Sequence, residues 1–295
     1  MRNTPDNQSP PGLQTTSSQS EGARQRSTVV SAASPQSDYH NRNLTRFSWF
    51  PDHTPPVNDE YSQRVVMRPA EVSWRATKLA DLEIRILEHI PTIRLTAQLR
   101  LKTGARPQPI TFNQGAEIFI HRGELEMPQG IFPAGLYLRL PAGCDETADQ
   151  LILRTIETSN VVTPASEDGL LIYLAAGQIA ETDTEQRRIN TNDDSRWLPG
   201  PVDGTEVLPL HGHGSGNAML VRWHKKGAFR PRLDPFGEEV LVLKGKLYDS
   251  HGSYTAGTWI RNPVPAWQTW AGVEDTVIYY KNGHFTDTGL STDAC

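Results

Sequence analysis

Cysteine is scarce in this chain of 295 residues, which has only Cys144 and Cys295. One pair cannot form the set of disulfides that holds a small secreted domain together. The first residues, MRNTPDNQSPPGLQTTSSQSEG, contain no apolar segment of the kind that a secretory signal requires. We therefore expect a reducing, cytoplasmic location.

Long apolar runs and blocks of basic residues are also missing. No stretch approaches the ~18 consecutive apolar residues of a transmembrane helix, so we expect no membrane partner. The formal net charge is −5. Binding to nucleic acid through its phosphates requires basic residues in clusters, so we expect no nucleic-acid partner either.

Helical periodicity is absent, and short alternating runs take its place. Apolar residues recur at every second position and are punctuated by 23 glycines and 22 prolines. Such a period predicts antiparallel strands and an all-β fold. The runs lie at 82–90, 92–101, 116–127, 136–143, 206–211, 218–224 and 275–285.

Composition divides the chain into three parts. Residues 1–45 are mostly Ser, Thr, Gln, Asn and Pro, which predicts a disordered tail. We expect an N-terminal domain over 46–190, in which 46–70 form an irregular arm that packs on this same domain. A C-terminal domain should cover 191–295, and the polar segment 181–194 is interpreted as a linker or a long surface loop.

A repeat with an offset of 122 residues connects the two domains. GAEIFIHRG at 115–123 matches GEEVLVLKG at 237–245, and the next 20 residues of each copy align without a gap. The coinciding residues include several glycines and a proline: Gly123 and Gly245, Gly135 and Gly257, Pro141 and Pro263. Such agreement indicates two copies of one β domain.

This framework resembles the cupin superfamily, whose motifs are G-x5-H-x-H-x3/4-E-x6-G and G-x5-P-x-G-x2-H-x3-N. The segment GEEVLVLKG…DSHGSYTAGTWIRNP is most similar to the ChrR-like cupins. The resemblance covers about residues 65–290. It implies a bicupin, with two tandem RmlC-like jelly-roll barrels of the double-stranded β-helix type.

The resemblance also implies chemistry. Cupins typically hold Fe, Mn, Ni, Cu or Zn with three histidines and one glutamate. ChrR-like relatives include a domain of zinc-dependent anti-sigma factors and dioxygenases that cleave diketones and hydroxyacetophenones. A homodimer formed by strand exchange would also be in keeping with the family.

The motif positions of the first copy lack metal ligands. They are occupied by Ile110, Phe112, Ala116 and Glu146. Aliphatic and aromatic side chains do not bind metal ions, so we expect an apolar mouth and a structural or ligand-binding role.

In the second copy only the carboxylate remains, as Glu238. The H-x-H position falls within 232–235, and the final histidine is replaced by Gln268. Arg230 and Arg232 would repel a divalent cation, so we expect no transition metal. Glu238, Arg232 and Gln268 are instead the predicted catalytic residues. Burial would raise the pKa of Glu238 and suit it to acid–base chemistry, although a salt bridge to Arg230 or Arg232 is the alternative.

Other histidines offer a second interpretation. His211 and His213 form an H-x-H, and with His224 and Glu238 they could hold Fe, Mn or Zn. The simpler interpretation places the HGHG segment in an exposed loop and His224 at the rim of the barrel.

Aromatic residues are concentrated in the second copy. We expect some of them to line a pocket for a planar or apolar ligand, whereas packing in the core is the alternative. The predicted substrate-binding residues are Trp223, Arg230, Tyr248, Trp259, Trp267 and Trp270.

These patterns support three hypotheses for function. The first is a bicupin that binds a small organic molecule and isomerises, cyclises or dehydrates it without the usual metal. The second is a metal-dependent dioxygenase or oxidoreductase with atypical ligands. The third is a non-catalytic sensory or regulatory cupin.

Overall fold

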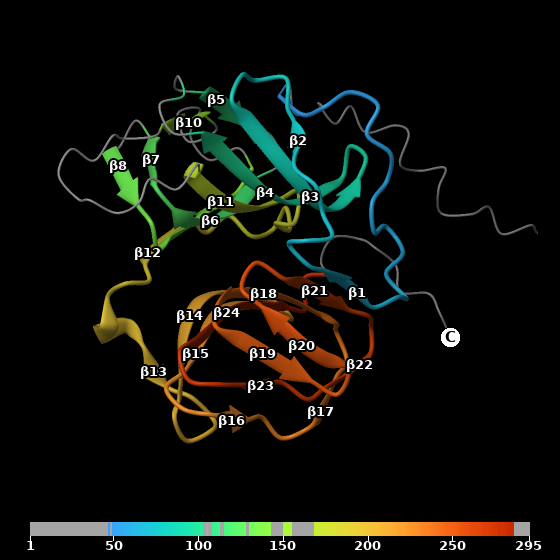
Figure 1. The fold of residues 1–295 in the computed structure, drawn as a ribbon, viewed down its shortest axis with the longest axis vertical. Helices are drawn as coiled ribbons and strands as arrows, with labels where there is room; N and C mark the ends of the chain where they lie inside the picture. The colour runs from blue at the N-terminus through green and yellow to red at the C-terminus, as the bar shows by residue number, and fades with distance from the viewer. Residues whose placement is uncertain are drawn as a thin grey trace, which may run out of the picture. The chain divides into compact units, whose positions relative to one another are not determined.

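The computed structural model describes residues 47, 49–102, 105, 108–112, 115–127, 130–142, 150–154 and 168–285. Within them the regular elements are strands, apart from the 3-10 helix η2 (Asp194–Arg196), as Figure 1 shows. The all-β prediction is confirmed. No helix in the described part is long and apolar enough to cross a bilayer. The predicted tail lies outside the described residues.

The first barrel is built from a seven-stranded and a four-stranded antiparallel sheet. The larger sheet has the order β12 (Arg187–Asn190), β9 (Leu136–Leu140), β6 (Ala116–Arg122), β11 (Asp168–Ala176), β4 (Arg94–Lys102), β3 (Leu82–Ile90) and β2 (Arg75–Ala76). The smaller has the order β5 (Gln108–Thr111), β10 (Gln150–Arg154), β7 (Glu124–Met127) and β8 (Gly130–Pro133).

The second barrel repeats this plan. Its seven-stranded sheet has the order β1 (Val65–Met67), β21 (Trp259–Asn262), β18 (Glu238–Lys244), β24 (Thr276–Asn282), β15 (Gly216–Trp223), β14 (Thr205–His213) and β13 (Leu198–Pro199). A four-stranded sheet contains β16 (Gly227–Ala228), β23 (Ala271–Gly272), β19 (Lys246–Asp249) and β20 (Gly252–Thr255). A separate two-stranded sheet pairs β17 (Arg232–Asp234) with β22 (Ala266–Gln268).

Each barrel donates one strand to the other. The strand β1 precedes the first barrel in sequence but pairs with β21 of the second, and Figure 1 draws it in blue beside that red strand. The strand β12 occupies the equivalent place on β9 of the first barrel. The prediction that the whole arm packs on the first domain was therefore wrong for β1, although Trp49 and Phe50 do lie in the first barrel's core. The polar segment 181–194 contains β12 and is more than a linker.

Alternation along the central strands produces three apolar cores. On β18, Val240 and Val242 face the interior of the second barrel, whereas Leu241 and Leu243 lie in a core to which both barrels contribute. Phe119 of β6 belongs to this shared core, and its neighbour Ile118 belongs to the first barrel's interior. Because side chains on a strand point alternately to opposite faces, one sheet can serve both cores.

The turns of the two copies depend on glycine. Gly123 and Gly245 have φ angles of +80° and +76°, which favour glycine. A Cβ atom on Gly123 would lie 2.3 Å from the carbonyl oxygen of Gly169, and one on Gly245 would lie 2.7 Å from Cα of Thr276. The repeated glycines are therefore required by the close approach of neighbouring backbone.

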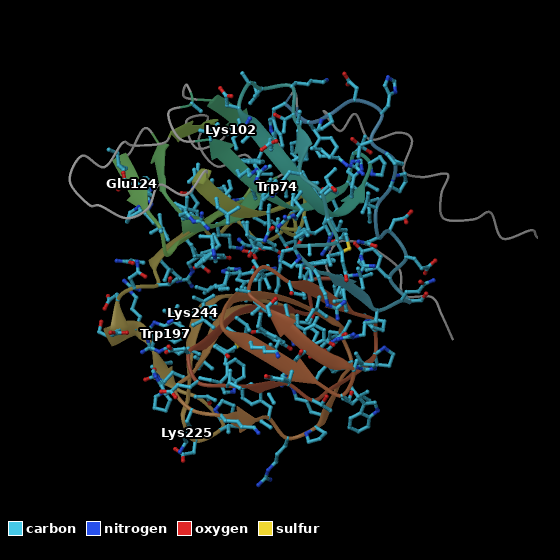
Figure 2. The ribbon with its side chains drawn as sticks, in the orientation of Figure 1. Trp74, Lys102, Glu124, Trp197, Lys225 and Lys244 are labelled. Carbon is cyan, nitrogen blue, oxygen red and sulfur yellow. The ribbon has the colours of Figure 1, made fainter. Side chains whose placement is uncertain are left out.

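The repeat extends to surface contacts. The guanidinium of Arg100 stacks 4.4 Å from the ring centre of Trp74, and that of Arg222 lies 4.2 Å from the ring centre of Trp197. Figure 2 labels both tryptophans. Each arginine also forms an ion pair with a glutamate of the preceding strand. Equivalent residues thus make equivalent cation–π contacts in the two copies.

Candidate functional site

Glu238 stands at the start of β18 with its side chain inside the second barrel. Its exposed fraction is 0%. Asn262, its partner across the strands, donates from Nδ2 to Oε1 of Glu238 at 2.6 Å. Trp270 donates from Nε1 to the same oxygen at 2.9 Å. Two donors from different elements therefore fix one carboxylate oxygen.

A second buried carboxylate, Asp234, lies in the same interior. Its Oδ2 accepts hydrogen bonds from the hydroxyl of Tyr280 at 3.3 Å and from Nδ2 of Asn282 at 3.0 Å. The backbone N–H of Phe236 donates to Oδ1 at 2.9 Å. Arg232, two residues before Asp234, donates to the hydroxyl of Tyr280 at 3.1 Å. The hydroxyl of Tyr280 therefore joins the arginine to the carboxylate.

Burial changes the acidity of Glu238. Loss of hydration raises its pKa to about 7, and the charge of Asp234 also raises it, while the hydrogen bonds from Asn262 and Trp270 oppose the increase. This is the direction expected from the sequence. A carboxyl with a pKa near neutrality can both accept and release a proton, as a general base or acid must.

The N-terminal arm contributes a cation to this interior. Arg64, just before β1, donates from Nε to Oδ1 of Asn262 at 2.7 Å. Its terminal nitrogen donates to Asp249 at 2.5 Å and to the hydroxyl of Tyr254 at 3.0 Å. Because Asn262 also holds Glu238, the arm is linked to the carboxyl by a chain of two hydrogen bonds.

The first barrel provides an internal comparison. In it Ala116 pairs with Leu140 and Ala176, just as Glu238 pairs with Asn262 and Asn282. The six polar positions of the second barrel are Arg232, Asp234, Glu238, Asn262, Tyr280 and Asn282, and their counterparts are Ile110, Phe112, Ala116, Leu140, Leu174 and Ala176, all in the first barrel's apolar core. The fold does not need these polar groups, because the same barrel forms without them. The predicted apolar character of Ile110, Phe112 and Ala116 is confirmed, and Glu146 lies outside the described residues.

The structure brings some of the predicted site residues to Glu238 and leaves others outside. Trp270 contacts Glu238 directly, and Arg232 reaches the cluster through Tyr280. Gln268 pairs with Arg232 in the β17–β22 sheet. Trp267 is 68% exposed, on the outer side of this sheet. Arg230 is exposed.

Three predicted pocket residues belong elsewhere. Trp259 lies in the core shared by the two barrels, on the opposite face of the sheet from Glu238. Trp223 is a core residue whose indole nitrogen donates to the carbonyl of Gly227 at 3.1 Å. Tyr248 faces away from the interior, because its neighbour Leu247 takes the inward position on β19. The packing alternative is thus the correct one for Trp223 and Trp259.

The alternative histidine set does not assemble around Glu238. His211 and His213 contact Asp183, with His211 Nε2 and Asp183 Oδ2 2.7 Å apart, on the side of the sheet that faces the first barrel. His224 pairs with Glu206 at the surface. The side chain of His211 is only 7% exposed, so the expectation of an exposed HGHG loop was wrong for this residue.

Sequence reasoning missed Arg64, Asn262, Tyr280 and Asn282. A signal existed for three of them, because Asn262 shares a strand face with Ile260, and Tyr280 and Asn282 share one with Ile278. Polar residues in register with an apolar face indicate a buried polar cluster. Arg64 carried no such signal, since it arrives from a strand exchanged between the barrels.

The transition metal implied by the resemblance does not fit these residues. At the motif positions the chain offers Arg232, Asp234 and Glu238, with no imidazole among them. Two N–H donors already occupy Oε1 of Glu238. Within the described residues no three His, Cys, Asp or Glu side chains form a group that could hold a metal ion.

Comparisons with solved structures find the same fold in other proteins. The protein YlbA of Escherichia coli superimposes with a TM-score of 0.54 at 12% identity, over 76% of this chain and 93% of that one. A putative glyoxylate-induced protein of Pseudomonas aeruginosa gives 0.52 at 12% identity, over 80% and 96%. A putative dioxygenase of Nostoc punctiforme gives 0.51 at 13% identity, over 75% and 82%. These likenesses show the fold alone, and no curated protein matches the sequence.

The family model described as ChrR Cupin-like domain matches the chain twice, at residues 62–153 and 185–286. Both matches begin just before an exchanged strand, β1 or β12, and so follow the repeat seen in the structure. The chain is a bicupin of the cupin superfamily and belongs to the ChrR Cupin-like family.

Proposed function

We propose that the second barrel binds a small organic molecule beside Glu238 and transfers a proton to or from it. The observation that carries this proposal is the contrast between the barrels. Six positions that are apolar in the first barrel are polar in the second. Four of the six, Asp234, Glu238, Asn262 and Tyr280, are buried, whereas Asn282 is half-buried and Arg232 is exposed. Buried polar clusters are often no more stable than apolar packing of the same volume. The presence of such a polar cluster in only one of the two copies therefore supports a role for it in function.

Each polar residue has a distinct role in this proposal. Glu238 accepts a proton from an acidic C–H or O–H group of the ligand and later returns it. Asn262 and Trp270 both bind Oε1, and they thereby fix the plane in which the carboxylate meets the ligand. Arg232 provides the positive charge that stabilises the anion formed when the proton leaves.

Access to Glu238 requires movement, because this side chain has no exposed surface. The β17–β22 pair forms a sheet of its own and carries Arg232 and Asp234. Its outer side presents Leu233 and Trp267, which are 50% and 68% exposed. We propose that this sheet opens to admit the ligand and that these apolar side chains form the first contact.

Deuterium exchange tests the proposal without knowledge of the final product. The protein is incubated in D₂O with a panel of small diketones and hydroxyaryl ketones, and incorporation at acidic C–H positions is followed by NMR. Wild type should accelerate exchange for at least one compound. Glu238→Gln should still bind that compound but exchange it at the uncatalysed rate.

His224→Gln is the matched control, since His224 is an ionisable residue of the same barrel that lies away from the cluster. It should exchange like wild type. Exchange that survives in Glu238→Gln would contradict the proposal. Exchange that requires one added equivalent of Fe, Mn or Zn would favour the dioxygenase alternative.

A further inference from the structure

The side-chain amide of Asn262 lies between Arg64 and Glu238. Nε of Arg64 donates to Oδ1 of Asn262 at 2.7 Å, and Nδ2 of Asn262 donates to Oε1 of Glu238 at 2.6 Å. A guanidinium has donors and no acceptor, so the amide must present its oxygen to Arg64. The amide nitrogen is then the end that remains for Glu238. Arg64 therefore determines which end of the amide the carboxyl meets.

The end of the amide that faces Glu238 favours one protonation state of this carboxyl. The amide nitrogen donates and suits a carboxylate, whereas the amide oxygen would accept the proton of a neutral carboxyl. With Arg64 in place, turning the amide would break the hydrogen bond at Oδ1 and aim its N–H groups at the guanidinium, donor against donor. The hydrogen bond from Asn262 accordingly lowers the pKa of Glu238, against the burial that raises it to about 7.

Arg64 reaches this interior because it precedes the exchanged strand β1. That strand pairs with β21, which carries Asn262 (Figure 1). Val66 packs against the core of the second barrel, and Arg64, two residues earlier, shares its face of the strand. Asp249 pairs with Arg64 at 2.5 Å, and the opposite charges of a close ion pair largely cancel at a distance. The effect of Arg64 on Glu238 therefore passes mainly through the amide of Asn262.

The first barrel lacks both members of this contact. Gln186, which precedes the exchanged strand β12, is exposed. Leu140 occupies the position of Asn262. Strands are exchanged in both directions, so the exchange itself does not require an arginine that points inward. Such an arginine is present in the barrel that contains the buried carboxyl.

Other groups also act on Glu238. The charge of Asp234 on β17 raises its pKa, while hydrogen bonds from the hydroxyl of Tyr280 on β24 and the indole of Trp270 lower it. Asn262 differs from Trp270, because an indole N–H only donates whereas an amide can turn and accept. The turn of this amide is the step that the arm prevents.

We propose that Arg64 is a positioning residue, which holds the amide of Asn262 in the orientation that favours the ionised form of Glu238. The strand exchanged into the second barrel thereby controls whether Glu238 can act as a base. Its consequence for catalysis rests on the proposed function, whereas the effect on the carboxyl itself requires no ligand.

Infrared spectroscopy of the Glu238 carboxyl band, assigned by comparison with Glu238→Gln, measures the pKa of this group without a ligand. Arg64→Met should raise the pKa by about one unit, the effect of losing one hydrogen bond to a charged group. Arg64→Lys, whose ammonium also only donates, should raise it less. Asn262→Leu should raise it as well, and adding Arg64→Met to that variant should cause no further rise.

Asp249→Asn is the matched control. It removes the ion pair of Arg64 and weakens the arm, but it leaves the donor to Asn262 in place, so it should not raise the pKa of Glu238. If Asp249→Asn raises the pKa as much as Arg64→Met does, or if Arg64→Met raises it further in Asn262→Leu, Arg64 does not act through the amide and the inference is wrong. An unchanged pKa in Arg64→Met would also overturn it, even where deuterium exchange by wild type supports the proposed function.

Discussion

The indole nitrogen of Trp270 lies 2.9 Å from Oε1 of Glu238, so a residue between β22 and β23 holds a carboxyl on β18 that no solvent reaches. The hydrogen bond stabilises the ionised carboxylate and opposes the effect of burial. Trp270 is thus a positioning residue that also limits how far the pKa of Glu238 rises.

Replacing Trp270 with phenylalanine should raise the pKa of Glu238. The ring remains, but the N–H donor to the carboxylate is lost, and hydrogen bonds to charged groups contribute about 1.5–3 kcal/mol. We expect the pKa to increase by about one unit or more from its value near 7. Isotope-edited infrared spectroscopy of the carboxyl band measures it. Trp267→Phe, at an exposed position, should leave the pKa unchanged, and equal shifts in both variants would contradict this account.

Replacing Arg64 with methionine should destabilise the second barrel. Asn262, Asp249 and Tyr254 all lose a charged donor. Because Arg64 is 22% exposed, water replaces part of this interaction, and we expect a loss of about 2 kcal/mol in urea unfolding. Arg187→Met, on the exchanged strand β12 with a surface partner, should cost less than about 1 kcal/mol. Equal losses of unfolding free energy in the two variants would show that Arg64 stabilises the barrel no more than an exposed ion pair does.

Replacing Arg94 with methionine should be the most damaging of these changes. It leaves Glu88 and Glu239 buried without their shared cation, and breaking a buried ion pair costs about 3–5 kcal/mol. The double variant Arg94→Met/Glu88→Gln should recover part of that loss in urea unfolding. No recovery would mean that packing, rather than charge, accounts for the role of Arg94.

Treatment with a chelator should leave the folded protein unchanged. The cupin motif positions carry an arginine and carboxylates with hydrogen-bond donors, instead of imidazoles. We therefore expect the same melting temperature with and without EDTA, and substoichiometric Fe, Mn, Ni, Cu and Zn by elemental analysis. One equivalent of metal that is lost together with stability would refute this expectation.

Much of the fold could be predicted from the sequence, because its signals are local. Alternation at 82–90 coincides with β3, and the repeated glycines mark turns whose backbone requires them. The exchange of β1 and β12 could not be predicted in this way. β1 is the short apolar segment VVM and β12 is the short, mostly polar segment RRIN, and the partners of both are set by tertiary packing across the repeat.

The site was predicted only in part, for a similar reason. Glu238 was found because it alone matched a motif position, and Trp270 because it lay near the expected mouth. Trp259 was misplaced because a cupin strand in a bicupin has two buried faces, so burial does not say which core receives a tryptophan. Composition does not distinguish the two faces of the strand. The register of Trp259 relative to Glu238 would have shown which face Trp259 occupies.

Glu239, the residue next to Glu238, should change the pH dependence of stability in the opposite direction to Glu238. It points to the other face of β18, where burial opposes ionisation but His284 and Arg94 hold its pKa well below the usual range. The stability due to this group is therefore complete above pH 4.5, the ordinary pKa of the side chain, and is lost as the pH falls below it. Glu239→Gln should be less stable than wild type above pH 4.5, and the deficit should shrink in more acidic solution.

The pH dependence of unfolding in wild type and Glu238→Gln tests the central claim most directly. A pKa raised from 4.5 to about 7 means that the folded chain holds this proton more tightly than the unfolded chain. The stability due to the group is then complete below pH 4.5 and is lost as the pH rises through 7. We predict that the unfolding free energy of Glu238→Gln increases relative to wild type by about 3 kcal/mol over this window. A difference that stays constant with pH would contradict the account.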